Sequence, residues 1–91
     1  MDNSDLDKLK AALDHVHDWP SVYPFKFIVP SDNQKIAQVE ALFNSETAEI
    51  TLRQSKNGKY TSVSVKEIMT NAEEVLRYYD NARKIDGLIA L

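Results

Sequence analysis

The stretch SKNGKYTSVSV, residues 55–65, decides the fold because it joins a tight-turn signal to a strand signal. Asn57 and Gly58 lie between two runs in which apolar and polar residues alternate. Asn-Gly is the strongest short signal for a β-hairpin, since both residues tolerate a positive φ angle. The runs at 48–54 and 60–66 are therefore predicted to be neighbouring antiparallel strands.

Two more strands are expected on either side of this hairpin. The first lies at residues 23–29, YPFKFIV, where three apolar residues alternate with Lys26 and Ile28. Pro24 is expected at the beginning of this strand if the strand interior is paired on both sides, because proline donates no ladder hydrogen bond. The short apolar segment GLIAL, residues 87–91, predicts a final strand.

Three segments carry apolar residues at helical spacing, which predicts three helices with one apolar face each. Trp19-Pro20 ends the first helix, because proline disfavours the α conformation in the residue before it. The three apolar stripes are Leu6, Leu9, Leu13 and Val16, then Ile36, Val39, Leu42 and Phe43, and finally Ala72, Val75, Leu76, Tyr79 and Ala82.

Each predicted helix begins near two residues with the spacing of a capping box. In this motif a hydroxyl and a carboxylate or amide three positions later satisfy free backbone donors at the helix start. The pairs are Ser4 with Asp7, Ser31 with Gln34, and Thr70 with Glu73.

This order predicts an α+β fold, a ferredoxin-like βαββαβ sandwich with an extra N-terminal helix. Right-handed crossovers place both later helices on one face of a sheet with strand order 4-1-3-2. Residues 1–19 form the added amphipathic helix, and residues 20–91 form the ferredoxin-like domain. The first helix packs either on the edge of its own domain or on a partner subunit. The side chains expected to face the two helices are Phe25, Phe27, Val29, Ile50, Leu52, Val63 and Val65.

Residues 20–91 resemble the YbeD-like family, small bacterial proteins of unknown function. The resemblance lies in YPFKFIV at 23–29, in SKNGKYTSVSV at 55–65 and in KIDGLIAL at 84–91. It implies an ACT-like ferredoxin-like fold and, by analogy with ACT domains, regulation by a small molecule or through protein contacts. The turn VPSDNQ, residues 29–34, lacks the glycine common in amino-acid-binding ACT domains, which argues against an amino-acid effector.

The composition is that of a globular protein, with 43% apolar and 27% charged residues. The net charge of −3 argues against nucleic acid as a partner. RNA-recognition domains share the βαββαβ order, but Tyr60 is the one aromatic residue on the predicted third strand. The acidic beginning and the lack of a long apolar run predict a cytoplasmic protein that does not associate with membranes.

Catalytic and metal-binding patterns are weak in this sequence. His15 and His17 lie two positions apart, on different sides of a helix, and cannot grip one metal ion together. There is no cysteine, and no histidine accompanies a candidate serine nucleophile. We therefore expect no enzyme activity, no metal and no cofactor.

One group of side chains remains as a candidate binding site. Basic residues on and beside the hairpin accompany hydroxyl groups, which suits an acidic protein partner or a small anionic ligand. Alternatively, the lysines keep the hairpin and an edge strand soluble. The candidates are Lys26, Arg53, Lys56, Lys59, Tyr60, Ser62, Ser64 and Lys66.

Two functions follow from these observations. The first is a non-enzymatic regulatory or adaptor domain that acts by binding a protein. The second is an ACT-like regulatory domain that senses a small molecule, as a homodimer with the ligand between subunits.

Overall fold

The computed structural model describes residues 3–91, with the side chains of Asn3, Ser4 and Leu6 left out. The predicted cap at Ser4 and the predicted apolar role of Leu6 therefore lie outside the described side chains. The elements in chain order are α1 (Asn3–Val16), β1 (Ser21–Pro30), α2 (Asn33–Glu40), β2 (Glu49–Gln54), β3 (Tyr60–Met69), α3 (Ala72–Ala82) and β4 (Ile89–Ala90).

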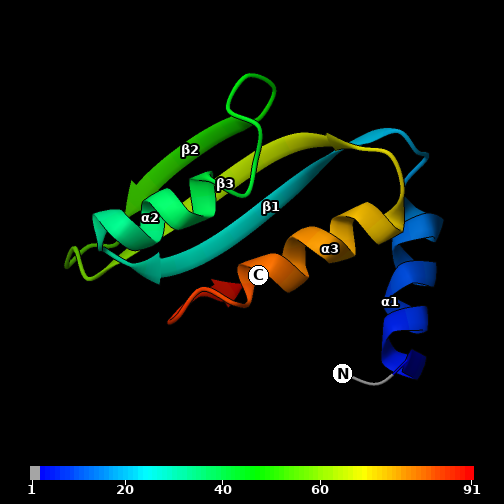
Figure 1. The fold of residues 1–91 in the computed structure, drawn as a ribbon, viewed down its shortest axis with the longest axis horizontal. Coiled ribbons are helices and arrows are strands. Elements are labelled where there is room, and N and C mark those ends of the chain that lie inside the picture. Colours follow the sequence, from blue (N-terminus) through cyan, green and yellow to red (C-terminus); the bar gives the residue numbers. More distant parts are fainter. Residues whose placement is uncertain (1–2) are drawn as a thin grey trace.

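The four strands form one antiparallel sheet in the order β2-β3-β1-β4, which confirms the predicted strand order (Figure 1). In the register, Phe27 lies opposite Val63, and Val65 lies opposite both Phe25 and Ile50. Because side chains alternate along a strand, this register gathers the apolar residues on one face. The structure is an α+β fold in which an N-terminal helix precedes a βαββαβ-like order.

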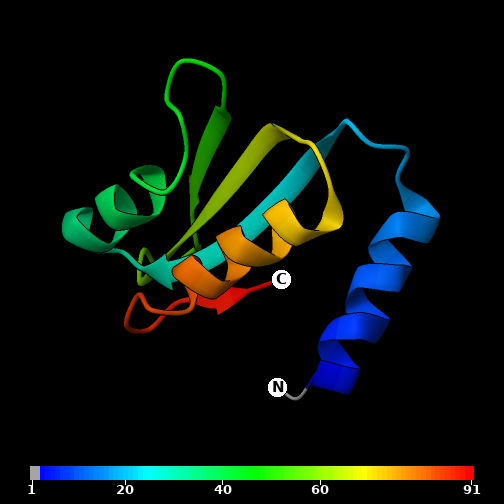
Figure 2. The ribbon, with the colours of Figure 1, turned by 45° about the vertical axis from the view of Figure 1, so that its right-hand side comes forward.

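The core lies between this face of the sheet and the helices α2 and α3 (Figure 2). The Phe25 ring contacts the rings of Phe43 and Tyr79, with centroids 5.2 and 5.3 Å away. Six of the seven predicted core residues pack there, with Ile50 half-buried. The buried apolar residues are Phe25, Phe27, Val29, Val39, Phe43, Val63, Val65, Met69, Ala72, Val75 and Ala82.

The prediction that Leu52 is covered by the helices is wrong. Leu52 lies opposite Val63, on the helix face, yet it is 47% exposed. β2 is the edge of the sheet, and the eight-residue α2 packs over β1 and β3 instead. The outer part of the helix face therefore ends at an uncovered leucine.

Glu67 is a buried acidic residue that the sequence patterns did not single out. It lies on the helix face of β3, where its Oε1 accepts a hydrogen bond of 2.8 Å from the Thr47 hydroxyl. Its Oε2 is buried with no hydrogen-bond partner among the described residues. Thr47 therefore supplies the one hydrogen bond that holds this carboxylate.

The helix α2 is capped one residue later than predicted. The side chain of Asp32, which has extended backbone angles, accepts a hydrogen bond of 2.8 Å from the N–H of Gln34. Ser31, the predicted cap, instead shares a hydrogen bond of 2.9 Å with the hydroxyl of buried Thr61. Asp32 is an equally good cap by residue type and lies one position closer to the helix.

The cap of α3 is shifted in the same way. Asn71 is the N-cap, and its side chain accepts from the N–H of Glu74 at 2.8 Å. The predicted pair of Thr70 with Glu73 does not form the box. Thr70 instead donates its hydroxyl to the Glu74 carboxylate at 3.0 Å.

The hairpin forms at the predicted place but with a longer loop. The N–H of Ser55 donates to the carbonyl of Tyr60 at 2.8 Å, so four residues lie between the paired ends. Gly58 has a φ of +73°, whereas Asn57 does not have a positive φ. Asn57 contributes its side-chain oxygen instead, accepting from the N–H of Lys59 and from the Ser55 hydroxyl, each at 3.0 Å.

Pro24 lies inside β1 rather than at its beginning, because the strand starts at Ser21. β4 pairs only with the end of β1, at Phe27 and Ile28, and the next backbone bond runs from the N–H of Leu91 to the carbonyl of Lys26. Backbone groups two residues apart on a strand point the same way, so the Pro24 nitrogen lies on the side of β1 that β4 leaves unpaired. Proline is tolerated in such a position.

The helix α1 packs against α3 of the same chain, which agrees with the predicted placement on its own domain (Figure 2). Leu13 contacts the core, whereas Val16 is 74% exposed. Across residues 3–91, none of the helices has the length and apolar character required to cross a membrane.

Candidate functional site

The face of the sheet opposite the helices carries six of the eight predicted binding residues. The strand register sets their neighbours: Ser64 lies between Thr51 and Lys26, whereas Ser62 lies between Arg53 and Ile28. We call this surface the open face. The six residues on it are Lys26, Arg53, Tyr60, Ser62, Ser64 and Lys66.

A shallow hollow of about 280 Å³ lies on the open face beside the hairpin. It brings together side chains from β1, β2 and β3, although Lys26 and Arg53 are far apart in the sequence. Ser64 and Lys66 do not line it, and Lys66 lies instead opposite Glu49 in the register. The lining residues are the predicted Lys26, Arg53, Tyr60 and Ser62, together with Ile28, Gln54 and Ser55.

The remaining two predicted residues, Lys56 and Lys59, are exposed in the hairpin loop. The backbone on both sides of them is fixed: the N–H of Gly58 donates to the Ser55 carbonyl at 2.9 Å, and the N–H of Lys59 donates to Asn57. These two hydrogen bonds hold the backbone of the loop that carries Lys56 and Lys59 next to the hollow.

The basic residues of this region are free of ion pairs within residues 3–91. The ion pairs there join Lys10 to Glu73 and Arg83 to Asp80, on the other side of the molecule. Five cations without an ion pair in residues 3–91 therefore lie on the open face and its hairpin loop, in a chain of net charge −3, and two of them, Lys26 and Arg53, line the hollow. The five are Lys26, Arg53, Lys56, Lys59 and Lys66.

Hydroxyl groups around the hollow differ in their availability. Ser62 donates to the carbonyl of Arg53 at 3.3 Å, and the Ser55 hydroxyl oxygen accepts from the N–H of Tyr60 at 3.1 Å. The Tyr60 and Ser64 hydroxyls have no partner among the described residues. They remain available to a bound molecule.

The open face also carries apolar side chains that were not among the predicted binding residues. Val22 and Ile68 lie opposite each other and are 54% and 63% exposed. Ile28 lies opposite Ile89, which is 53% exposed. Val22 and Ile68 fell outside the predicted strand limits, and extending the same alternation by two residues would have found them. The surface therefore offers apolar anchors at both ends of its basic centre.

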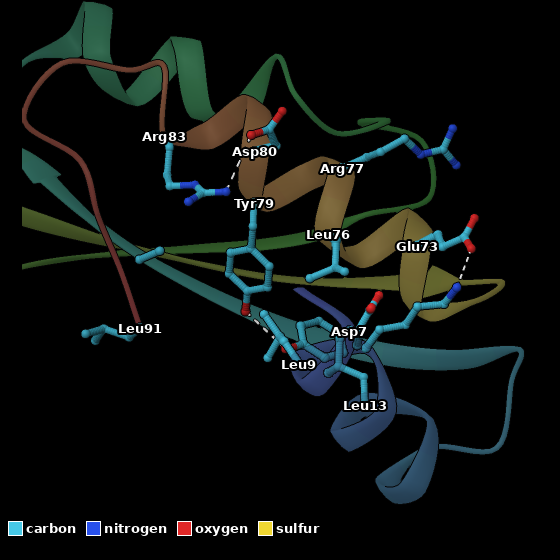
Figure 3. Close-up of a pocket in the computed structure, with 13 residues that line it drawn as sticks. Asp7, Leu9, Leu13, Glu73, Leu76, Arg77, Tyr79, Asp80, Arg83 and Leu91 are labelled. Carbon is cyan, nitrogen blue, oxygen red and sulfur yellow. Dashed lines mark hydrogen bonds and ion pairs between the residues drawn. The ribbon is translucent and has the colours of Figure 1, made fainter. Parts of the chain in front are cut away.

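A second, larger concavity lies between α1 and α3, with a volume of about 960 Å³ (Figure 3). Leu9 and Leu13 of α1 face Leu76 and Tyr79 of α3 across it. At its rim Lys10 and Glu73 form an ion pair, which raises the pKa of Lys10 and lowers that of Glu73 through their hydrogen bond and opposite charges. The sequence predicted the leucine stripe but not this cleft.

Two tyrosines form the polar part of the cleft floor. The hydroxyls of Tyr23 and Tyr79 share a hydrogen bond of 3.1 Å. Burial raises the pKa of Tyr79 well above its usual value, and the hydrogen bond to Tyr23 adds to this effect. Tyr79 is therefore a neutral hydrogen-bonding group at ordinary pH.

The two histidines behave differently from each other. His15 is exposed, whereas His17 is half-buried and stacks on Trp19 with a centroid distance of 5.1 Å. Trp19 in turn donates to Asp14 at 2.8 Å. His17 therefore packs against Trp19 in the segment that follows α1. Within the described part of the chain, no three metal-ligating side chains cluster.

Comparison with known proteins identifies a family. No curated protein matches the chain, and neither does any solved structure. A family model described as a protein of unknown function, DUF493, matches residues 14–91. The match starts inside α1, earlier than the resemblance at residue 20, and it covers β1 to β4 with α2 and α3. The chain therefore belongs to the DUF493 family, the YbeD-like family that its hairpin and first strand resemble.

Proposed function

We propose that this protein is a regulatory or adaptor domain that binds an acidic protein partner through the open face of its sheet. The observation that carries the proposal is the group of five cations without an ion pair on the open face and its hairpin loop, in a chain that is acidic as a whole. Such a field attracts and orients an oppositely charged surface.

The geometry suits a partner with carboxylates and apolar side chains in alternation. Lys26 and Arg53 border the hollow, where a partner carboxylate receives two charge-assisted hydrogen bonds. Ile28 and Ile89 on one side supply apolar contact area. Tyr60 adds a hydroxyl and an aromatic ring, a residue type enriched at interfaces.

The fold supports a binding role in a more general way. The βαββαβ order and the strand order β2-β3-β1-β4 agree with a ferredoxin-like, ACT-like domain. We infer a non-enzymatic role, since the hollow holds cations and hydroxyls without an acid, a base or a nucleophile in working geometry.

A charge-reversal experiment tests the proposed function. The variant Lys56→Glu with Lys59→Glu places two acids beside the hollow, and the control Lys8→Glu with Lys84→Glu makes the same charge change elsewhere. Affinity capture from the native cell, read by mass spectrometry, is expected to lose partners with the first variant and keep them with the control. Recovery of every wild-type partner by the hairpin variant contradicts the proposal.

The cleft between α1 and α3 supports a second candidate, the sensing of a small molecule. Its volume and its mainly apolar lining fall within the range of ligand sites in proteins. A thermal-shift screen of metabolites separates the two functions, because a ligand of the folded state raises the unfolding midpoint. A rise that disappears in Leu76→Glu, whose side chain lines the cleft, supports sensing; no rise with any metabolite leaves the adaptor role.

A further inference from the structure

The outer edge of β2 is an unpaired strand edge. The N–H of Ser55 donates to the carbonyl of Tyr60, at the start of β3. The backbone groups of the odd-numbered β2 residues therefore bond to β3, and those of the even-numbered residues point away from the sheet. The backbone groups of Ile50, Leu52 and Gln54 therefore face away from the sheet. No backbone partner within residues 3–91 meets them, and every β2 residue except Ile50 is exposed.

The sequence of this edge is complementary to itself in the antiparallel direction. Residues 49–53 read Glu-Ile-Thr-Leu-Arg, with Thr51 at the centre. If Thr51 lies opposite Thr51 of a second copy, Glu49 lies opposite Arg53 and Ile50 lies opposite Leu52. The charged pair falls on the open face, and the apolar pair falls on the helix face.

We propose that the β2 edges of two copies pair antiparallel about Thr51, which joins two sheets into one of eight strands. The occupant of this edge is a second copy of this chain. The proposal shares Arg53 with the proposed function, because Arg53 borders the hollow and also lies opposite Glu49 of the second copy. Lys26, Tyr60 and the hairpin lysines stay accessible on the joined open face.

Three observations favour this register. Ile50 and Leu52 both point their backbone groups outward, so that they form a hydrogen-bonded pair across the two-fold axis. The exposed Leu52, which no helix covers, gains Ile50 of the second copy as its neighbour. Arg53, which has no ion-pair partner within residues 3–91, gains Glu49 of the second copy.

Neighbouring registers lose this complementarity. A shift by one residue brings the two faces of the strand out of phase, which sets apolar residues opposite polar ones. A shift by two residues centres the axis on Leu52, which leaves Arg53 opposite Thr51 and Ile50 opposite Gln54. The register centred on Thr51 therefore satisfies charge, apolar contact and hydrogen bonding together.

Charge swapping tests the pairing directly on the full chain. Glu49→Arg alone and Arg53→Glu alone each set two like-charge pairs across the axis, and each is expected to weaken dimerisation about tenfold. The double variant Glu49→Arg with Arg53→Glu restores both opposite-charge pairs. Sedimentation over a concentration series measures the dimer in each case, and Lys84→Glu makes the same charge change as Arg53→Glu at a position outside this edge.

Mixing the two single variants gives the sharpest outcome. Every charged pair across the axis is then opposite in sign, so a mixed dimer is expected where neither variant alone forms one at the same concentration. Native mass spectrometry resolves the mixed species by mass. Single variants that dimerise as well as the wild type, or a mixture without mixed dimers, overturn the proposal.

A cross-link checks the register without changing any charge. The chain has no cysteine, so Thr51→Cys introduces one thiol at the axis, where the two Cα atoms of a non-hydrogen-bonded pair lie about 4.5 Å apart. Mild oxidation is expected to link Thr51→Cys into a covalent dimer faster than Ser64→Cys, which lies on the same face of β3. Equal rates for the two variants, or a wild type that sediments as a monomer at every concentration, refute the pairing.

Discussion

Asn71 caps α3 by accepting, at 2.8 Å, a hydrogen bond from the backbone N–H of Glu74. Asn71→Ala is expected to destabilise the fold by about 1 kcal/mol, the usual cost of losing a side-chain cap. Thr70→Ala removes an exposed hydroxyl contact to Glu74 and is expected to cost less than half as much. Urea unfolding followed by circular dichroism measures both, and a larger loss for Thr70→Ala would favour the cap at Thr70.

Gly58 and Gly87 provide a second comparison, since both have left-handed backbones with φ of +73° and +81°. A Cβ on Gly58 meets no atom within 4 Å, so Gly58→Ala is expected to cost only the backbone strain of about 1 kcal/mol. A Cβ on Gly87 lies 3.2 Å from the Pro30 ring, so Gly87→Ala is expected to cost more. Equal losses in chemical denaturation would contradict the close approach of residue 87 to Pro30.

Stability is expected to depend on Thr47, because its hydroxyl donates to the buried side chain of Glu67. Thr47→Val keeps the side-chain shape but removes the hydrogen bond to Oε1, which leaves the Glu67 carboxylate without a hydrogen-bond partner among the described residues. The expected loss in free energy of unfolding is about 1–3 kcal/mol. Ser45→Ala, in the same loop and exposed, is the control and is expected to change stability little. A Thr47→Val variant as stable as that control would contradict the contact.

The ion pair between Lys10 and Glu73 predicts a pH-dependent contact between α1 and α3. The pKa of Glu73 is lowered from 4.5 by the hydrogen bond and charge of Lys10, so its contribution is present above that value and is lost as the pH falls through the lowered pKa. The pKa of Lys10 is raised from 10.5, so its contribution is present below that value and is lost as the pH rises through the raised pKa.

Trp19 reports on this contact, because it is the one tryptophan of the chain and lies three residues after the end of α1. Its fluorescence is expected to change as the pH falls below the range in which Glu73 is ionised. Added salt is expected to reduce this change, because the side chains of Lys10 and Glu73 are both exposed. Glu73→Gln is expected to remove this acid transition. The same transition in Glu73→Gln and in the wild type would assign it to another group.

The alternation of apolar residues made the sheet predictable. Phe27 and Val63 were assigned to the buried face from period-two spacing alone, and the Asn57-Gly58 signal placed the hairpin that aligns β2 with β3. The loop length was not predictable, because Asn57 serves the turn through its side chain instead of through a positive φ. The caps were displaced because Ser31 precedes Asp32 and Thr70 precedes Asn71, and all four residue types suit a helix start.

The candidate site was predictable in part for a similar reason. The predicted hairpin places Arg53, Tyr60 and Ser62 on two neighbouring strands. The predicted strand order then places Lys26 on the strand next to them. Lys66 was placed on the correct face but lies opposite Glu49, outside the hollow. The cleft at α1 depends on how two helices meet at Leu13 and Leu76, and the spacing of apolar residues within one helix does not contain that information.

The position of Pro24 within β1 has a consequence for how far copies of this molecule can add to one another. A sheet with two unpaired edge strands can add further molecules at both edges and grow into a fibre. Here the edge beyond β1 lacks an amide hydrogen at Pro24, and two residues of β4 already occupy its far end. If β2 pairs about Thr51 as proposed, assembly is therefore expected to stop at a closed pair of two copies.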